Sequence, residues 1–502
     1  MAATTTTTTA EFAAPLTAPR PVSLPEASSF LSDGQWAVLM ALMDTVAPAI
    51  CMQGSDAKDQ DPATIYLPSS QYSETAAALR RASSPLDHPS ELLEAYLAER
   101  PSDNPLFAQV LASVLSNLPP NKKRELRYLL SILSTRPGAL ILTATVTPLT
   151  SLSVQERLRV LNRWRISSLW AFRSLFKSIT TLGKLSFIRS SATFCPLTGF
   201  PPVPAAWVAD GGFNHQYEFL QFSRGPPAAV GGGANGEAPA VEVVADLVIV
   251  GSGCGAGVVA NRVAREFGPA VKVLVLEKGR HFDASHYPLS QAAGLSNLFE
   301  AGGVVEADDG SVTVTAGSTF GGGGTVNWSA SLQTQDFVRK EWAQGGKLSF
   351  FEGAEFQKCL ESVWEVMGCS GDKLTPNHAN RVLLDGAAKL GYHAKIVPQN
   401  CGNTEHDCGY CTLGCWRGEK KGPVNGWFPE AAKNGVQFVE GIQVERVLFE
   451  QKEGKKVARG VRGVWKPRDG GETVEVIIRA NKVVVSCGTL WSPIVLMNSG
   501  LK

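Results

Sequence analysis

A glycine-rich turn of the kind that binds dinucleotides lies near the middle of the chain. Residues 247–257 read LVIVGSGCGAG, and Gly251, Gly253 and Ala256 occupy the three small positions of a G-x-G-x-x-G/A turn. The first glycine permits the tight turn, the second lets the backbone approach a pyrophosphate, and the third small residue lets a helix pack close to the preceding strand. Unpaired N–H groups at the start of that helix would bind the phosphates.

An acidic residue stands where such a site needs one. Residues 271–276 form a second apolar run, and Glu277 closes it, 26 residues after Gly251. At this position a carboxylate accepts hydrogen bonds from a ribose, and an acidic residue argues against NADP. Strand, turn, helix, strand and acid occur in order, so the sequence predicts dinucleotide binding. The pattern alone leaves both FAD and NAD open.

Four cysteines lie close together later in the chain: Cys401, Cys408, Cys411 and Cys415. Thiolates select zinc or an iron–sulfur cluster, and the glycine-rich segment around them suits a metal-binding knuckle. Free or structural thiols and two disulfides are the alternatives. Ten cysteines in 502 residues are too few for a disulfide scaffold. Cys254, inside the glycine turn, is predicted to be a small packing residue.

The elements that position these residues fall into two classes. Residues 246–250 and 271–276 are apolar strand patterns separated by a helix pattern, which predicts a βαβ unit and a parallel sheet. Before residue 190 the patterns are helical, and the clearest covers residues 31–48, with Ser32 as the N-cap. Further helices are expected at 91–100, 105–118, 121–133, 154–177 and 376–392. We therefore predict an α/β fold, with an α/β domain preceded in the chain by an α-helical region.

Composition shifts divide the chain into four segments. We predict a disordered Thr/Ala/Pro-rich tail at 1–27, an α-helical region at 28–222, a Gly/Pro-rich linker at 223–241 and a nucleotide-binding domain at 242–502.

One helical stretch, residues 154–190, is strongly basic. It holds eight Arg and Lys residues against the single acid Glu156, with Trp164, Trp170 and other apolar residues between them. Such a helix could lie on a membrane surface. The alternative is a helix that packs its apolar face on the protein and exposes its arginines to solvent.

Charge and hydrophobicity exclude some classes of protein. There are 47 Lys and Arg residues against 46 Asp and Glu, and the net charge of +1 argues against a nucleic-acid binder. The sequence has no run of eighteen apolar residues, so it predicts no membrane span. The Thr-rich N-terminus lacks the pattern of a secretory signal peptide. We therefore expect an intracellular protein, membrane-associated or peroxisomal.

Two more segments carry a family resemblance. Residues 317–328 read GSTFGGGGTVNW and residues 488–501 read GTLWSPIVLMNSGL. Together with the glycine turn they resemble the glucose–methanol–choline (GMC) family of flavoprotein oxidoreductases. The helical N-terminal region, Cys254 and the CGYCTLGC segment at 408–415 resemble the long-chain fatty alcohol oxidases within that family. This resemblance implies FAD as the cofactor and a Rossmann-like, GMC-type FAD-binding domain.

The resemblance also implies roles for individual residues. Gly251, Gly253 and Ala256 would hold the pyrophosphate, with Glu277 on the adenosine ribose. A second group would lie close to the isoalloxazine ring, the adenine or the returning chain: Gly321, Gly322, Gly323, Gly324, Asn327, Val444 and Gly488. Gly323 and Gly324 stand where many relatives have serines, so hydroxyl contacts are lost there.

Family members use a pair of C-terminal residues, a histidine and a second histidine or asparagine, to take up the alcohol proton. The resemblance places this pair beyond residue 502, so the chain would be the N-terminal two-thirds of an oxidase with no catalytic residue of its own. His378 and His393 are the nearest substitutes, and we expect them on a solvated helix.

The expected reaction is oxidation of a long-chain primary alcohol by O₂, which gives the aldehyde and H₂O₂. The alternatives are a sugar or polyol dehydrogenase of the same family, or a non-catalytic flavin-binding remnant.

Overall fold

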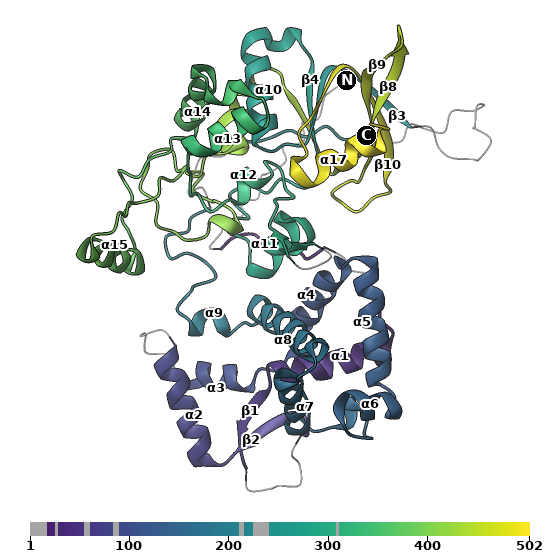
Figure 1. Cartoon of the computed structure of the whole chain (residues 1–502), viewed down its shortest axis with the longest axis vertical. Coiled ribbons are helices and arrows are strands. Elements are labelled where there is room, and N and C mark those ends of the chain that lie inside the picture. The colour runs from purple at the N-terminus through teal and green to yellow at the C-terminus, as the bar shows by residue number, and fades with distance from the viewer. Residues whose placement is uncertain are drawn as a thin grey trace, which may run out of the picture. The chain divides into compact units, whose positions relative to one another are not determined.

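The computed structural model describes residues 18–25, 29–54, 61–83, 90–209, 215–223, 240–307 and 311–501. Most of the predicted N-terminal tail and of the predicted linker lies outside these residues. The chain forms two compact units (Figure 1). We call residues 23–204 and 290–315 the helical unit, and residues 1–22, 205–289 and 316–502 the sheet unit.

The helical unit is built mainly from helices around one apolar core. Its helices are α1 Asp33–Val46, α2 Ser69–Ala82, α3 Ser90–Ala98, α4 Pro105–Ser116, α5 Pro120–Leu133, α6 Arg136–Thr143, α7 Val154–Ile166, α8 Trp170–Ser190, α9 Phe194–Leu197 and α11 Gln291–Leu298. Its short strands are β1 Ala49–Met52, β2 Thr64–Leu67, β5 Val305–Glu306 and β6 Thr313–Val314. Leu39, Phe107, Leu111 and Trp164 are among the buried residues of the core.

Local chemistry explains where these helices begin and end. Ser32 caps α1 as predicted, in a reciprocal capping box with Gln35. The single helix expected at 154–177 is two helices, because residues 167–169 leave the helical path between α7 and α8. Arg173 stabilises that break by donating from Nη1 to the carbonyls of Ser167 (2.6 Å) and Ser168 (2.7 Å).

The sheet unit contains a six-stranded sheet. Its strands are β3 Val241–Val250, β4 Val273–Glu277, β7 Gln437–Glu440, β8 Ile442–Lys452, β9 Lys455–Trp465 and β10 Val474–Val485. Its helices are α10 Cys254–Phe267, α12 Gly323–Val326, α13 Asp336–Gly345, α14 Ala354–Met367, α15 His378–Leu390, α16 Phe428–Lys433 and α17 Gly488–Asn498. The strand order is β7-β4-β3-β10-β9-β8, parallel from β7 to β10 and antiparallel from β10 to β8.

Alternation along β3 buries both faces of this sheet. Val248 and Val250 belong to one core, which also holds Val495 of α17. Leu247 and Ile249 belong to a second core, which also holds the alanines of α10. Because successive side chains of a strand point to opposite faces, α10 and α17 cover opposite faces of the sheet (Figure 1). The parallel pairing predicted for β3 and β4 from the βαβ pattern is confirmed, whereas β9 and β8 extend the sheet with antiparallel pairs that were not predicted.

The units divide the chain differently from the predicted segments. Residues 205–222 were expected in the helical region but lie in the sheet unit, where Phe219 pairs with Phe438 and Phe222 packs on Trp465. Residues 290–315 were expected with the sheet but lie in the helical unit, where Asn297 donates to the carbonyl of Ser23. Both differences depend on long-range contacts that no local pattern encodes.

None of the helices in the described ranges is long and apolar enough to cross a membrane.

Candidate dinucleotide-binding site

The predicted glycine turn lines a cavity of about 130 Å³ at the carboxyl ends of β3 and β4. Seven of the predicted site residues come together in its wall: Gly251, Gly253, Glu277, Gly322, Gly323, Val444 and Gly488. They come from five separate stretches of the chain. Ligands of open α/β sheets bind in this position, outside the carboxyl ends of the strands.

Gly251 makes the turn possible. Its φ is +95°, and a Cβ there would lie 2.3 Å from the carbonyl oxygen of Ser486. Any other residue here would have an unfavourable backbone conformation, and its Cβ would collide with the Ser486 carbonyl just after β10. This explains why the first position of the turn is glycine.

Three other glycines leave room for a ligand. A Cβ on Gly253, Gly323 or Gly488 would meet no protein atom within 4 Å, although all three residues line the cavity. Gly253 is also the N-cap of α10 and offers no side chain to cap that helix. Open space beside unpaired N–H groups is the arrangement that binds a pyrophosphate, so the residues fit a dinucleotide.

Glu277 is buried beneath the turn. Its Oε2 accepts from the Ser252 hydroxyl (2.6 Å) and the Ser252 N–H (3.1 Å), and its Oε1 accepts from the Gly279 N–H (2.7 Å). Burial raises the pKa of this carboxyl group, and the three hydrogen bonds partly oppose that effect. The carboxylate therefore holds the turn, and Oε1 keeps a lone pair for a ribose hydroxyl.

Ser252 links the glycine turn at residues 251–257 to the glycine segment at residues 321–324. This role was not predicted from the sequence. Its Oγ donates to Glu277 and accepts from the N–H of Gly321 (2.8 Å). The side chain is fully buried. Its place between the first two glycines of the turn was the available signal.

Four predicted residues do not line the cavity. Ala256 is fully buried in the core beneath α10, as its small size predicts. A Cβ on Gly321 would collide with Thr325 and one on Gly324 with Pro423, so these two glycines allow close packing within the protein. Asn327 forms a local turn: it donates to the Gly324 carbonyl and accepts from the Ser329 N–H.

Lys278 and Trp491 extend the cavity wall and were also missed. The ammonium of Lys278 lies 4.2 Å from the centroid of the Trp491 ring, an attractive cation–π distance. Trp491 and Val444 also line an adjoining pocket of about 400 Å³. Val444 was predicted to lie beside the adenine. If it does, Lys278 and Trp491 would lie at the adenine end of the cofactor.

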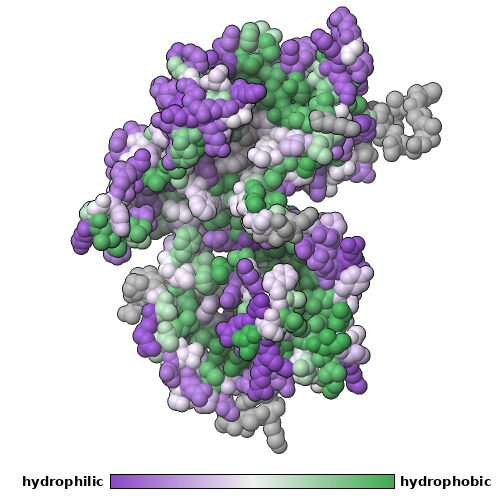
Figure 2. Space-filling view, in the orientation of Figure 1, coloured by the Kyte–Doolittle hydropathy of each residue, from purple (hydrophilic) through white to green (hydrophobic). Residues whose placement is uncertain are grey.

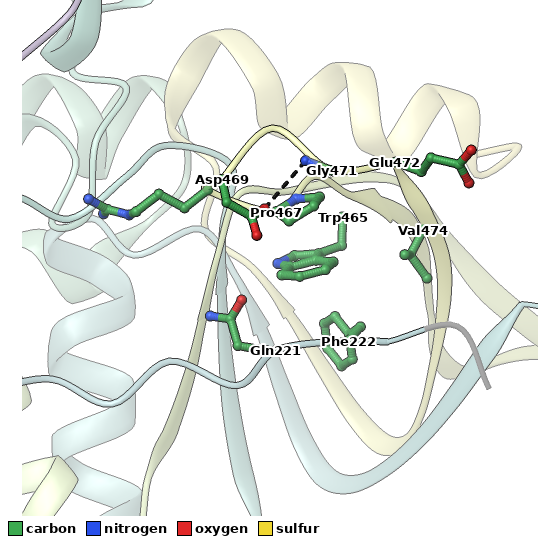
Figure 3. Close-up of a pocket in the computed structure, with 9 residues that line it drawn as sticks. Gln221, Phe222, Trp465, Pro467, Asp469, Gly471, Glu472 and Val474 are labelled. Carbon is green, nitrogen blue, oxygen red and sulfur yellow. Dashed lines mark hydrogen bonds between the residues drawn. The ribbon is translucent and has the colours of Figure 1, made fainter. Parts of the chain in front are cut away.

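A larger cavity of about 480 Å³ lies elsewhere (Figure 3). Trp465 and Phe222 form its floor, and Asp469 accepts from the N–H of Gly471 in the turn above them. None of the predicted site residues lines it, and we do not regard it as the cofactor site.

The four clustered cysteines are free thiols, as are the other six. Among the residues that the structure describes, no group of three or more His, Cys, Asp or Glu side chains could hold a metal ion. The zinc or iron–sulfur alternative is therefore unsupported. Cys254, which we expected to be a small packing residue, is exposed at the start of α10.

The described histidines lie outside the cavity. His378 starts α15 and His393 follows it, and both are exposed, as expected for solvated positions. His281 contacts the rings of Tyr217 and Phe320, and burial lowers its pKa to about 4.

Comparison with known proteins shows what this domain is similar to. The fold and cavity have the form of a dinucleotide-binding α/β protein, and residues 295–502 match the family model of the GMC oxidoreductases. This part of the chain is therefore similar to the GMC oxidoreductases, which bind FAD.

Its relatives include long-chain-alcohol oxidases of Arabidopsis thaliana. FAO4B is 37% identical over 51% of this chain and 34% of its own length, and FAO4A is 35% identical over 53% and 35%. The matches thus span about a third of these relatives. Pyridoxine 4-oxidase from "Mesorbium loti" is a distant structural neighbour, with a TM-score of 0.36, 18% identity and coverage of 51% of this chain and 52% of that chain.

Proposed function

We propose that this chain binds FAD and takes part in the oxidation of a long-chain primary alcohol to the aldehyde, with O₂ reduced to H₂O₂. The observation that carries the cofactor assignment is the open space above Gly253, Gly323 and Gly488 in one cavity. The similarity to long-chain-alcohol oxidases of Arabidopsis supports the substrate class.

Different residues of the cavity would bind different parts of the cofactor. The N–H groups that start α10, above Gly253, would bind the pyrophosphate. Glu277 would accept from the ribose, and Val444 would contact the adenine. When bound, FAD would supply the hydride acceptor for the oxidation of the alcohol. The protein keeps the turn rigid through Ser252, which ties the first glycine segment to the second.

A direct test is to load the purified chain with FAD and add alcohols without oxygen. Dodecanol should bleach the oxidised flavin, and readmitted oxygen should yield H₂O₂ and aldehyde in equal amounts. Gly253→Val, which fills the cavity, should bind no flavin and serves as the matched control. A chain that takes up no FAD would refute the proposal at its first step.

One observation favours a second candidate, a flavin-binding role without turnover. No histidine of the described residues lines the cavity, although a histidine is the group most often used to take up an alcohol proton near neutral pH. FAD binding with no bleaching by dodecanol or by glucose would support this candidate. Bleaching by glucose alone would favour a sugar or polyol dehydrogenase.

We also propose that the helical unit binds anionic membrane surfaces. At the α7–α8 junction Ile166, Leu169 and Trp170 are 75%, 60% and 73% exposed, and Arg163 and Arg165 are exposed beside them. Hydrophobic residues also gather over α6, next to the hydrophilic surface over α7 (Figure 2). Exposed apolar side chains next to arginines match the interface of an anionic bilayer.

Co-sedimentation with anionic vesicles at low salt tests the membrane proposal. Trp170→Ser combined with Leu169→Ser should abolish binding, whereas Trp328→Ser, which removes an equally exposed tryptophan from the sheet unit, should not. Equal binding by both variants would count against the proposed surface.

A further inference from the structure

The cysteine segment contains an aligned thiol, imidazole and carboxylate. The Sγ of Cys411 lies 3.2 Å from Nε2 of His406, and Nδ1 of His406 lies 3.2 Å from Oε2 of Glu419. Ser329 completes the surroundings of the sulfur, with its Oγ 3.3 Å from Sγ. A nucleophile that contacts a base, itself oriented by a third group, is the arrangement that activates cysteine side chains. We call Cys411, His406 and Glu419 the thiol site.

Neighbouring residues hold the thiol site in this geometry. Arg417 donates from Nε to Oε1 of Glu419 (2.7 Å), which leaves Oε2 for the imidazole. Lys420 donates from Nζ to the carbonyls of Cys411 and Asn327 and thereby fixes the backbone under the sulfur. The side chains of His406 and Glu419 are only 5% and 14% exposed, so solvent competes little for their hydrogen bonds.

The electrostatics favour the thiolate form. Burial by itself would raise the pKa of the Cys411 thiol, but the hydrogen bond with His406 and the charge of Lys420 outweigh it and lower that pKa to about 7. Hydrogen bonds with the Cys401 and Cys411 thiols raise the pKa of His406 to about 12. By contrast, burial raises the pKa of the nearby Cys408 thiol. One cysteine of the segment is thus distinguished from its neighbours.

We propose that Cys411 is a peroxide-reactive thiol, with His406 as the group that accepts its proton. The sulfur attacks one oxygen of H₂O₂, so an S–O bond forms and the O–O bond breaks. The proton held by His406 returns to the leaving hydroxide, which departs as water. Sulfur loses two electrons, the peroxide gains them, and Cys411 becomes a sulfenic acid.

Cys401 is placed to complete the cycle. Its thiol lies against the same imidazole as Cys411, and the residue is buried. Attack of the Cys401 sulfur on the sulfenic acid would form a disulfide and release a second water molecule. The inference stands without the proposed alcohol oxidation, since peroxide can be supplied from outside, although an oxidase in this fold would generate the same oxidant.

The test is site-resolved trapping of the sulfenic acid. The full chain is treated with dilute H₂O₂ and dimedone, and the labelled peptides are quantified by mass spectrometry. Cys359 is an internal comparator, because it is exposed on α14 and lies outside the thiol site. We expect Cys411 to label at least about ten times faster than Cys359 despite its lower exposure. Without dimedone, a Cys401–Cys411 disulfide should accumulate.

Variants separate the thiol site from simple accessibility. His406→Gln should slow labelling of Cys411 to the rate of Cys359, while labelling of Cys359 itself stays unchanged. Glu419→Gln should give an intermediate rate and does not depend on how well the first variant folds. Equal labelling of Cys411 and Cys359 in the unmodified chain would overturn the proposal. So would labelling that appears only after EDTA treatment, because the sulfur would then be a metal ligand.

Discussion

Two glycines of the same turn should respond to substitution in opposite ways. Gly253 has a φ of −67° and a ψ of −174°, a conformation open to any residue, and its Cβ would meet no protein atom within 4 Å. Gly253→Ala should therefore leave the free energy of unfolding of the apoprotein within about 1 kcal/mol of its original value, because lost capping preference and reduced chain entropy nearly cancel.

The same methyl group should greatly weaken cofactor binding. It would occupy the space next to the N–H groups of α10, and the loss of two hydrogen bonds to a charged phosphate costs about 3–6 kcal/mol. That range corresponds to at least about a hundredfold increase in the Kd for FAD. Gly251→Ala should instead destabilise the apoprotein by at least about 2 kcal/mol, since its Cβ would lie 2.3 Å from a backbone oxygen at a φ of +95°.

Urea unfolding of the apoproteins and flavin fluorescence titrations would measure both quantities for both variants. The expected result is a stable Gly253→Ala that binds FAD weakly. If that variant bound FAD as tightly as the original chain, the pyrophosphate would not lie above Gly253. If Gly251→Ala were as stable as the original chain, the steric argument for the turn would be wrong.

Three further predictions concern stability. Ser252→Ala removes the hydroxyl that links Glu277 to the Gly321 N–H and should lower the free energy of unfolding in urea by about 2 kcal/mol; an unchanged value would refute its linking role. Because burial lowers the pKa of His281 from 6.5 to about 4, only the unfolded chain takes up this proton as the pH falls through that range. Between pH 6.5 and about 4, the free energy of unfolding should therefore fall by roughly 1 kcal/mol for each pH unit. In His281→Phe, the free energy of unfolding measured in urea should depend less steeply on pH. Hydrogen bonds from the N-cap lower the pKa of Glu156, so its contribution to α7 is present above pH 4.5 and is lost as the pH falls further. Glu156→Ala should cost about 0.5 kcal/mol near neutral pH and less in acid, as thermal unfolding would show.

Local sequence patterns were sufficient for several elements. The capping box that starts α1 involves residues three apart, and the turn between β3 and α10 requires glycine because of its own backbone angles. Two apolar runs separated by a helix pattern likewise predicted the order of β3, α10 and β4. In each case the physical cause, a cap, a φ angle or a periodic apolar face, acts within a few residues of the signal.

The site itself depends on contacts between distant segments. Which glycines leave room for a cofactor is decided by what lies opposite them: Gly323 faces open space, whereas Gly324 faces Pro423. The pairing of Ser252 with Gly321, and of His406 with Cys411, could not be read from spacing, although His406 stands two residues before the cysteine motif.

The sequence by itself thus determined the family motifs, the dinucleotide turn and several of the helices, because these follow from local conformation and periodicity. Only the tertiary structure decided that residues 290–315 join the helical unit, that the four clustered cysteines do not form a metal-binding group in the described part of the chain, and that one of them meets a histidine and a carboxylate. These outcomes depend on how separate elements pack, and packing is a property of the whole chain.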